Sequence, residues 1–424
     1  MNMKIAFISY EYPPDTACGG IATYVRQAVS MLSNKGHYIE VFSGSFNENK
    51  IQKDNQVIIH RIKASKRQEF TKQVGTIFAQ RYQQIKFDVL EAPEIGAEAA
   101  EAIKLVPEIP LVVKLHTPSY VLQELFYTPP SFQMKLRRYF GALRRGNIPK
   151  PFHNYSYNPD NDLERIYTLK ADEITAPSLA IANKLNIDWQ VDKQKVIHLP
   201  NPYIPSQKLL DIPIKTQTNI ITFIGRLEIR KGILDLAKAI PLILNKEPKT
   251  KFRFVGSSLP SPNPKLDMHQ YLEKKLKLFL PSLEFIGNLP LEKIPSILAE
   301  TDICVFPSIW ENFPYVCLEA MSAGRGIVGS SAGGMAELLD GGKVGKLVPP
   351  KSPKSIAKAV IELLQNPEER MKLGEAARQR VLSQYNLERI GALQEASYLR
   401  AIEKRQALGA RNIAELPQPI YIQT

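Results

Sequence analysis

Short apolar runs alternate with longer helical patterns along nearly the whole chain, and this alternation limits the fold more than any other feature. Runs of this kind, bounded by polar and turn residues, are typical of buried strands in parallel sheets. Strands that alternate with helices predict an α/β fold built on parallel sheets. The expected strands are 4–9, 38–43, 57–62, 88–90, 111–116, 173–176 and 195–199 in the first half, and 220–224, 252–255, 283–286, 303–306 and 327–329 in the second.

The length of 424 residues suits two domains of about 200 residues each. Residues 200–218 are rich in proline and polar side chains, which indicates a linker. Past Pro349 the pattern is helical to about Gln406, with a last helix expected from Asn386. We therefore expect a first domain over 1–205, a second over 206–385, a closing helix over 386–408 and a loose tail over 409–424.

Two glutamates lie eight residues apart where a strand is expected to run into a helix. Pro314 suits the first turn of that helix, so Glu311 falls in the preceding loop and Glu319 inside the helix. This is the carboxyl edge of a strand, where ligands bind in doubly wound sheets. One acid there can accept hydrogen bonds from sugar hydroxyls, and the other can lie beside a reacting carbon. Taken alone, such a pair is more often one solvated acid and one acid favoured by the helix dipole.

A cationic loop follows another expected strand. The run 220–224 ends at Gly225, the loop carries Arg226, Arg230 and Lys231, and a helix is expected from about Gly232. Cations beside the free N–H groups of a helix start suit a diphosphate. The alternative is that Arg230 and Lys231 are ordinary solvated charges.

Two glycine pairs open helices, one in each half of the chain: Gly19-Gly20 and Gly333-Gly334. Glycines at such positions let backbone amides approach an anion, although either pair could also be a plain turn. No GxGxxG or Walker sequence is present, so dinucleotide or ATP binding has little support. One pair in each half fits a donor held between two domains.

The spacing of Glu311 and Glu319, with Phe313-Pro314 between them, resembles the signature of retaining glycosyltransferases of family 4 (group 1), as do Arg226 and Lys231. This resemblance implies the GT-B fold, in which two Rossmann-like doubly wound domains face each other across a cleft and the last helix crosses back to the first domain. It also implies transfer of a hexose from an NDP-sugar, of the UDP-glucose or GDP-mannose type, to a glycan or a lipid-linked acceptor. The mechanism would be front-face and metal-independent, with the NDP-sugar as co-substrate and no cofactor.

The same resemblance assigns roles to particular residues. Arg226 and Lys231 would hold the diphosphate, Glu319 the ribose hydroxyls, and Glu311 the transferred sugar. His116, at the end of the expected strand 111–116, would contact the sugar or the acceptor, although a lone histidine is more often a hydrogen-bonded core residue. No second acid is evident beside His116, which favours the front-face route over a carboxylate nucleophile. The other expected donor-binding residues are Gly19, Gly20, Leu289, Asn312 and Phe313.

Metal and disulfide signals are weak. Asp160-Asn161-Asp162 follows Asn158-Pro159 rather than a strand, so helix capping explains it better than a metal-binding Asp-x-Asp. The three cysteines lack metal-ligand spacing, and Cys304 and Cys317 lie in apolar surroundings typical of buried thiols in a reducing cytoplasm. No signal core and no long apolar span is evident, so we expect a cytoplasmic location.

Part of the net charge of +13 is concentrated in residues 132–150. On a helical wheel the apolar side chains there form a stripe about 100° wide, and the cations occupy the rest of the circumference. This pattern indicates an interfacial helix on an anionic membrane, here the inner face, or a helix whose apolar stripe packs on its own domain. The apolar residues are Phe132, Leu136, Tyr139, Phe140 and Leu143, and the cations are Lys135, Arg137, Arg138, Arg144, Arg145 and Lys150.

Three other functions fit parts of the sequence. The positive charge alone would suit a nucleic-acid-binding protein, but no helix-turn-helix, RNP-like or zinc signature supports one, so no nucleic-acid partner is expected. NDP-sugar epimerases and phosphorylases share the GT-B architecture. An epimerase would convert the donor without an acceptor, and a phosphorylase would need inorganic phosphate.

Overall fold

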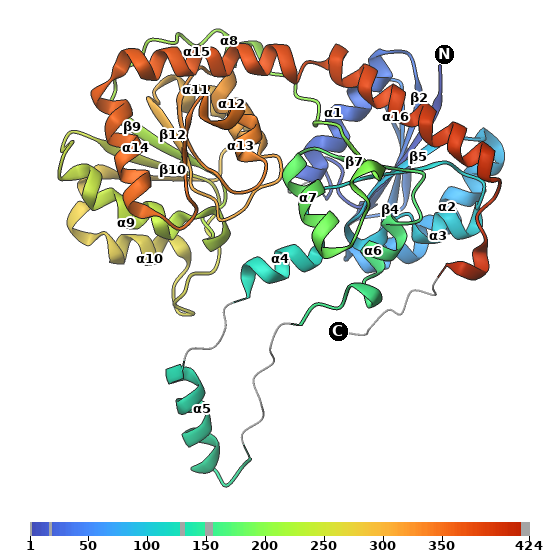
Figure 1. Ribbon diagram of the computed structural model, residues 1–424, viewed down its shortest axis with the longest axis horizontal. Helices are drawn as coiled ribbons and strands as arrows, with labels where there is room; N and C mark the ends of the chain where they lie inside the picture. The colour runs from blue at the N-terminus through green and yellow to red at the C-terminus, as the bar shows by residue number, and fades with distance from the viewer. Residues whose placement is uncertain (1, 17–18, 128–131, 149–155, 417–424) are drawn as a thin grey trace.

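The computed structural model describes residues 2–16, 19–127, 132–148 and 156–416, and it contains two α/β domains that lie side by side (Figure 1). The sheet of the first domain has the order β3-β4-β2-β1-β5-β6-β7-β8. Its strands are β1 (Lys4–Ser9), β2 (Tyr38–Ser45), β3 (Lys50–Asp54), β4 (Val57–Lys63), β5 (Val89–Pro93), β6 (Leu111–Lys114), β7 (Glu173–Ala176) and β8 (Val196–His198).

The sheet of the second domain has the order β11-β10-β9-β12-β13-β14, with every pair parallel. This is the order of a doubly wound sheet, and it reverses between β9 and β12. The fold class predicted from the alternation is therefore confirmed. The strands are β9 (Ile220–Ile224), β10 (Lys251–Val255), β11 (Leu283–Gly287), β12 (Ile303–Phe306), β13 (Gly326–Ser330) and β14 (Lys346–Val348).

Two strands escaped the sequence analysis, and both lie at sheet edges. β3 pairs antiparallel with β4, so the first sheet is not purely parallel as expected. Its residues KIQKD are mostly exposed and carry no apolar run, as is common for an edge strand. β14 has three residues, too few to produce a pattern.

The helices cover both faces of each sheet (Figure 1). Those of the first domain are α1 (Gly20–Asn34), α2 (Arg67–Ile85), α3 (Ala100–Leu105), α4 (Ser119–Phe126), α5 (Phe132–Leu143), α6 (Leu163–Thr168) and α7 (Leu179–Asp188). The expected linker contains α8 (Gln207–Leu210), and the second domain has α9 (Ile233–Leu244), α10 (Met268–Lys275), α11 (Ile294–Ala299), α12 (Tyr315–Ser322), α13 (Met335–Leu338), α14 (Pro353–Gln365) and α15 (Pro367–Gln384).

The last helix, α16 (Leu387–Leu408), returns from the second domain to the first, as the sequence predicts (Figure 1). Its Gln394 and Tyr398 both donate hydrogen bonds to Glu91 of β5, at 2.9 and 2.7 Å. The hydrophobic core on this side runs from α1 through α16 and α15 to α12, so it spans both domains. Burial of this shared apolar surface opposes separation of the two domains.

The expected loose tail is ordered as far as the structure describes it, to residue 416. Arg411 is buried and its guanidinium pairs with the buried carboxylate of Asp172. Leu416 is also buried. Tertiary contacts that sequence patterns do not reveal therefore hold this segment, and residues 417–424 lie outside the described part.

Candidate active site

The reversal point of the second sheet brings two loops together. The loop after β9 leads through the short helix η4 (Ile229–Lys231) to Gly232, which has a left-handed φ of 72°. A Cβ at Gly232 would lie 1.9 Å from the carbonyl oxygen of Pro307, at the end of β12. Glycine is therefore required both by the backbone conformation and by this close approach. As a result, Lys231 lies beside the loop that carries Glu311.

Glu311 lies in a small ionic cluster. Its carboxylate forms an ion pair with Lys231, lies 3.4 Å from an Arg230 nitrogen, and accepts a hydrogen bond from the Ser308 hydroxyl at 3.2 Å. Burial opposes ionisation of Glu311, but Lys231 and Arg230 outweigh it and hold the pKa of this carboxyl below its usual value. Glu311 is therefore an anion, and Lys231 a cation, at the same edge of the sheet.

Arg226 and Arg230 differ sharply in exposure. The Arg226 side chain is 50 % exposed and lies 3.3 Å from Glu228. Arg230 is buried between Glu228, at 2.9 Å, and Glu311. Arg230 is thus neither the solvated charge considered above nor open to a ligand, and it fixes Glu228 of its own loop and Glu311 of the neighbouring loop instead. The sequence showed its charge but not its burial.

Glu319 lies inside α12, as predicted, but in different surroundings from Glu311. No cation pairs with its carboxylate among the residues that the structure describes. Burial raises its pKa to about 7. A carboxylate that no cation engages has acceptor sites left for ligand hydroxyls.

The structure gives the Gly333-Gly334 pair a different role from the expected anion contact. A Cβ on Gly333 would lie 1.9 Å from the Glu311 carbonyl oxygen, and the Gly334 N–H donates to that same oxygen at 2.8 Å. The glycines therefore let the loop after β13 pack on the backbone at Glu311. The Gly334 N–H, one of the two amides expected to bind an anion, is therefore already hydrogen-bonded within the protein.

Two expected donor contacts, Phe313 and Leu289, are partly packed in the core. The Phe313 ring lies 5.8 Å from Tyr315 and 5.6 Å from Tyr385, centroid to centroid. Leu289 follows β11 and packs against the core shared by the two domains. The side chain of Phe313 is therefore occupied by aromatic packing, which the motif alone did not indicate.

The first domain supplies the start of α1 at the end of β1. Gly19 is the N-cap residue and offers no side-chain cap, so the first amides of α1 keep their hydrogen-bonding capacity. Outside the local backbone of α1, no atom of the described residues lies within 4 Å of a Cβ built on Gly20, whereas a Cβ on Gly19 would lie 3.4 Å from the Glu11 carboxylate. The open space at Gly20 is compatible with an anion at this helix start.

His116 lies two residues beyond β6, which ends at Lys114 rather than at His116 as expected. The strand ends early because the His116 N–H donates to both carboxylate oxygens of Glu94, at 2.9 and 2.8 Å. The His116 side chain is buried, and Nε2 has no hydrogen-bond partner among the residues that the structure describes. Burial, reinforced by Lys114 and Arg67, lowers its pKa to about 3, so the imidazole is neutral at physiological pH.

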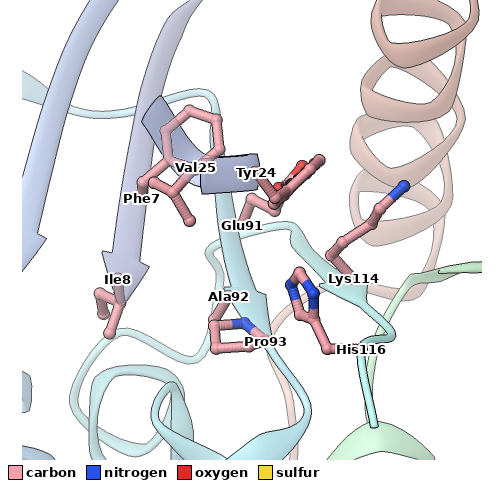
Figure 2. A pocket seen from close by; sticks show the side chains of 9 residues that line it. All are labelled: Phe7, Ile8, Tyr24, Val25, Glu91, Ala92, Pro93, Lys114 and His116. Atoms are coloured by element: carbon pink, nitrogen blue, oxygen red, sulfur yellow. Dashed lines mark hydrogen bonds between the residues drawn. The ribbon is translucent and has the colours of Figure 1, made fainter. Parts of the chain in front are cut away.

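Figure 2 shows the small pocket beside His116, which Tyr24, Glu91 and Lys114 also line. The Lys114 ammonium donates to the carbonyl of Leu199 at 2.6 Å, and burial lowers its pKa to about 7. Glu91 accepts a hydrogen bond from the Tyr24 hydroxyl at 2.6 Å. The sequence analysis missed Glu91 and Glu94 because it ended this strand at residue 90, whereas β5 runs to Pro93. Acids are therefore present beside His116, contrary to expectation.

Asn312 joins the two domains across the site. Its amide nitrogen donates to the backbone carbonyl of His116, and its amide oxygen accepts from the Ser178 hydroxyl at 2.6 Å. The Glu337 carboxylate accepts from the first two N–H groups of α7, both at 2.8 Å. The Asn312 side chain is thus engaged in domain contact, which differs from the donor contact expected for it.

Three smaller expectations can also be compared with the structure. The Asp162 carboxylate accepts from the Glu164 N–H at 2.9 Å and caps α6, so the capping interpretation is confirmed. Cys304 and Cys317 are buried free thiols, as predicted, and Cys18 lies outside the described residues. No described helix is long and apolar enough to cross a membrane.

Two doubly wound domains, with cations and a carboxylate at the reversal point of one sheet opposite the strand ends of the other, define the GT-B class of nucleotide-sugar glycosyltransferases. Comparison with known families agrees. The model "Glycosyltransferase Family 4" matches residues 18–207, and the model "Glycosyl transferases group 1" matches residues 209–380. Together they span most of the chain, which therefore belongs to the group 1, family 4 glycosyltransferases.

Individual relatives are similar over nearly their full lengths. An uncharacterized glycosyltransferase of Methanocaldococcus jannaschii is 26% identical over 376 residues, which is 85% of this chain and 89% of that protein. The structure of a sucrose-phosphate synthase from Thermosynechococcus elongatus superposes with a TM-score of 0.72 at 20% identity, over 95% of this chain and 99% of that one. HepE from Anabaena, in complex with UDP-glucose, gives a TM-score of 0.62 at 16% identity, over 94% and 99%. At these identities the two structures support the fold alone.

Proposed function

We propose that this enzyme moves a hexose from an NDP-sugar, of the UDP-glucose or GDP-mannose type, to a glycan or lipid-linked acceptor with retention of configuration. The observation that carries the proposal is the ion pair between Lys231 and Glu311 at the reversal point of the second sheet. A diphosphate that reached Lys231 would bring its sugar next to Glu311. Arg226, half exposed on the same loop, would bind the other phosphate oxygens as a planar fork.

The roles proposed for the other site residues rest on their hydrogen-bond partners and on their burial. Glu319, which has no cation partner among the described residues, would accept hydrogen bonds from the ribose hydroxyls. The amides at Gly19 and Gly20 would meet the donor from the first domain. His116, a neutral imidazole with an unpartnered Nε2, would bind a hydroxyl of the sugar or acceptor. Leu289, Asn312 and Phe313 would contact the donor base or sugar through their backbone groups.

The acids beside His116 favour front-face substitution over a covalent intermediate. Both oxygens of Glu94 accept the His116 N–H, and Glu91 accepts from Tyr24, Tyr398 and Gln394. A carboxylate used in this way is a poor nucleophile. The departing phosphate would instead take the acceptor proton while Arg226 and Lys231 stabilise its charge. This route requires no metal ion.

The buried thiols support a proposal for the location of the enzyme. We infer a cytoplasmic enzyme because Cys304 and Cys317 are buried as free thiols. Residues 132–150 would give peripheral contact with the inner membrane face, where a lipid-linked acceptor would lie. Lys150, as well as the side chains of residues 133 and 135, lies outside what the structure describes.

A nucleotide-sugar screen by thermal shift, followed by two variants, tests this function. Glu311→Gln should lower kcat while NDP affinity stays near wild type, and Glu319→Ala should weaken NDP binding. Equal loss of NDP affinity in both variants would overturn the assignment. Incubation with the donor alone distinguishes related activities, because a transferase gives slow hydrolysis, an epimerase a new NDP-sugar, and a phosphorylase turnover only with inorganic phosphate.

A further inference from the structure

The helix α5 stands apart from both domains (Figure 1). Its apolar stripe does not pack on the first domain, which was one of the two alternatives from the sequence. Phe132 is 75 % exposed and Phe140 63 % exposed, and the other stripe residues Leu136, Tyr139 and Leu143 are exposed as well. Monomeric proteins rarely leave such a contiguous apolar face uncovered, so this face indicates an interaction site.

The cations of α5 lie outside this stripe, together with the exposed side chain of Met134. Arg137 and Arg138, together with Arg144 and Arg145 just past its end, are exposed. No acidic residue occurs from Leu125 to Pro159. An apolar stripe with aromatic residues, flanked by arginines and free of acids, matches the headgroup region of an anionic bilayer. The charge favours an anionic surface over a second copy of this chain, since two α5 helices would repel each other.

The place of α5 in the chain connects it with the active site. α4 begins three residues after His116 and lies next to η4, which carries Lys231. α5 follows α4 after a short segment and hangs on the same side of the molecule (Figure 1). A surface bound by α5 would therefore lie near the edge where the two domains meet.

We propose that α5 is a peripheral membrane anchor that binds anionic phospholipid, with its apolar stripe in the interface and its arginines on the lipid phosphates. Binding is reversible, because one short helix with a few cations gives only moderate affinity. It weakens with salt, because exposed charges are screened. The anchor does not depend on which sugar or acceptor the enzyme uses.

Vesicle flotation of the full-length protein tests the anchor. Vesicles of phosphatidylcholine with phosphatidylglycerol should bind it, and vesicles of phosphatidylcholine alone should bind much less. Replacing Arg144 and Arg145 by Gln should lower the partition coefficient about 30-fold, given the usual contribution of each surface cation. Phe132→Ser with Phe140→Ser should lower it at least about tenfold.

Matched variants on the second domain serve as controls. Lys274→Gln with Lys277→Gln removes the same charge from another exposed site, and Leu278→Ser with Leu291→Ser removes exposed apolar side chains. Neither control should change binding. All variants should keep the melting temperature and the NDP-sugar hydrolysis of the wild type, because the replaced side chains are exposed and lie outside the site.

Several outcomes would overturn the proposal. These are equal binding to neutral and anionic vesicles, equal losses in the α5 variants and the controls, or no vesicle binding at all. Concentration-dependent dimerisation that the Phe132 and Phe140 replacements abolish, without vesicle binding, would show that a second copy covers α5 instead.

Discussion

The side-chain amide of Asn312 donates a hydrogen bond to the backbone carbonyl of His116, so one contact joins the carboxyl edges of two separate sheets. The same amide accepts from Ser178 at 2.6 Å. Both partners belong to the first domain, while Asn312 follows Glu311 directly in the chain. The residue next to Glu311, the carboxylate that we propose to lie beside the sugar, therefore also joins the two domains.

Asn312→Ala should lower kcat/KM with little change in NDP affinity. It removes two buried hydrogen bonds worth about 1 kcal/mol each, which corresponds to a loss of roughly 30-fold if both act in the transition state. Ser178→Ala removes one of the two and should cost less. Steady-state kinetics with NDP titration would measure both variants, and wild-type kcat/KM in Asn312→Ala would show that this contact does not align the domains for catalysis.

Arg226→Ala and Lys231→Ala should each lower kcat/KM by roughly 10- to 100-fold, because a hydrogen bond to a charged group contributes about 1.5–3 kcal/mol. NDP affinity should fall in parallel. Lys238→Ala, on the exposed face of α9, is the matched control and should be neutral. If both site variants bind NDP as tightly as the wild type, the diphosphate lies elsewhere.

The pH dependence of nucleotide binding should report on Glu319. Burial raises its pKa to about 7, so the acid is protonated below that pH and ionised above it. Only the carboxylate accepts two hydroxyl hydrogen bonds, so NDP affinity should rise between pH 6 and 8, by up to about tenfold per unit below the pKa. Calorimetric titration of Glu319→Gln with the same nucleotide should show a flatter profile. An identical pH dependence in both proteins would exclude this role.

Glu94→Gln should reduce kcat about tenfold or more at unchanged NDP affinity, because an amide NH2 replaces one of the two oxygens that accept the His116 N–H. Glu98→Gln is the comparison, since one Glu98 oxygen accepts from the Tyr10 N–H at 2.9 Å just after β1 while the other pairs with Arg67. Each variant is assayed well below its melting temperature. If kcat falls equally in both, Glu94 supports only the fold, and if kcat is unchanged it does not position His116.

The sequence was sufficient for the parts of the site that follow strand ends. Lys231 and Glu311 meet because the strands before them, β9 and β12, are neighbours at the reversal point of a doubly wound sheet. Charged residues that directly follow a buried apolar run can be identified from the sequence alone. The same reasoning found α16 and the capping residue Asp162.

The features that the sequence did not reveal depend on contacts between distant segments. Nothing in the local sequence shows that Asn312 would reach His116, that Arg230 would be buried between two acids, or that Glu94 would hold the backbone after another strand. β3 was missed because an exposed edge strand needs no apolar run. The ion pair between Arg411 and Asp172 likewise could not be predicted, because the sequence of the tail has no pattern that indicates it.

The anomeric configuration of the product tests the central claim most directly. With an α-linked NDP-hexose and a simple alcohol such as glycerol as acceptor, NMR of the purified glycoside reads a linkage that cannot interconvert in water. Front-face transfer at Glu311, with Arg226 and Lys231 on the leaving diphosphate, predicts an α-glycoside and full activity in the presence of a chelator. A β-glycoside from the same donor would contradict this mechanism and the roles assigned to these three residues.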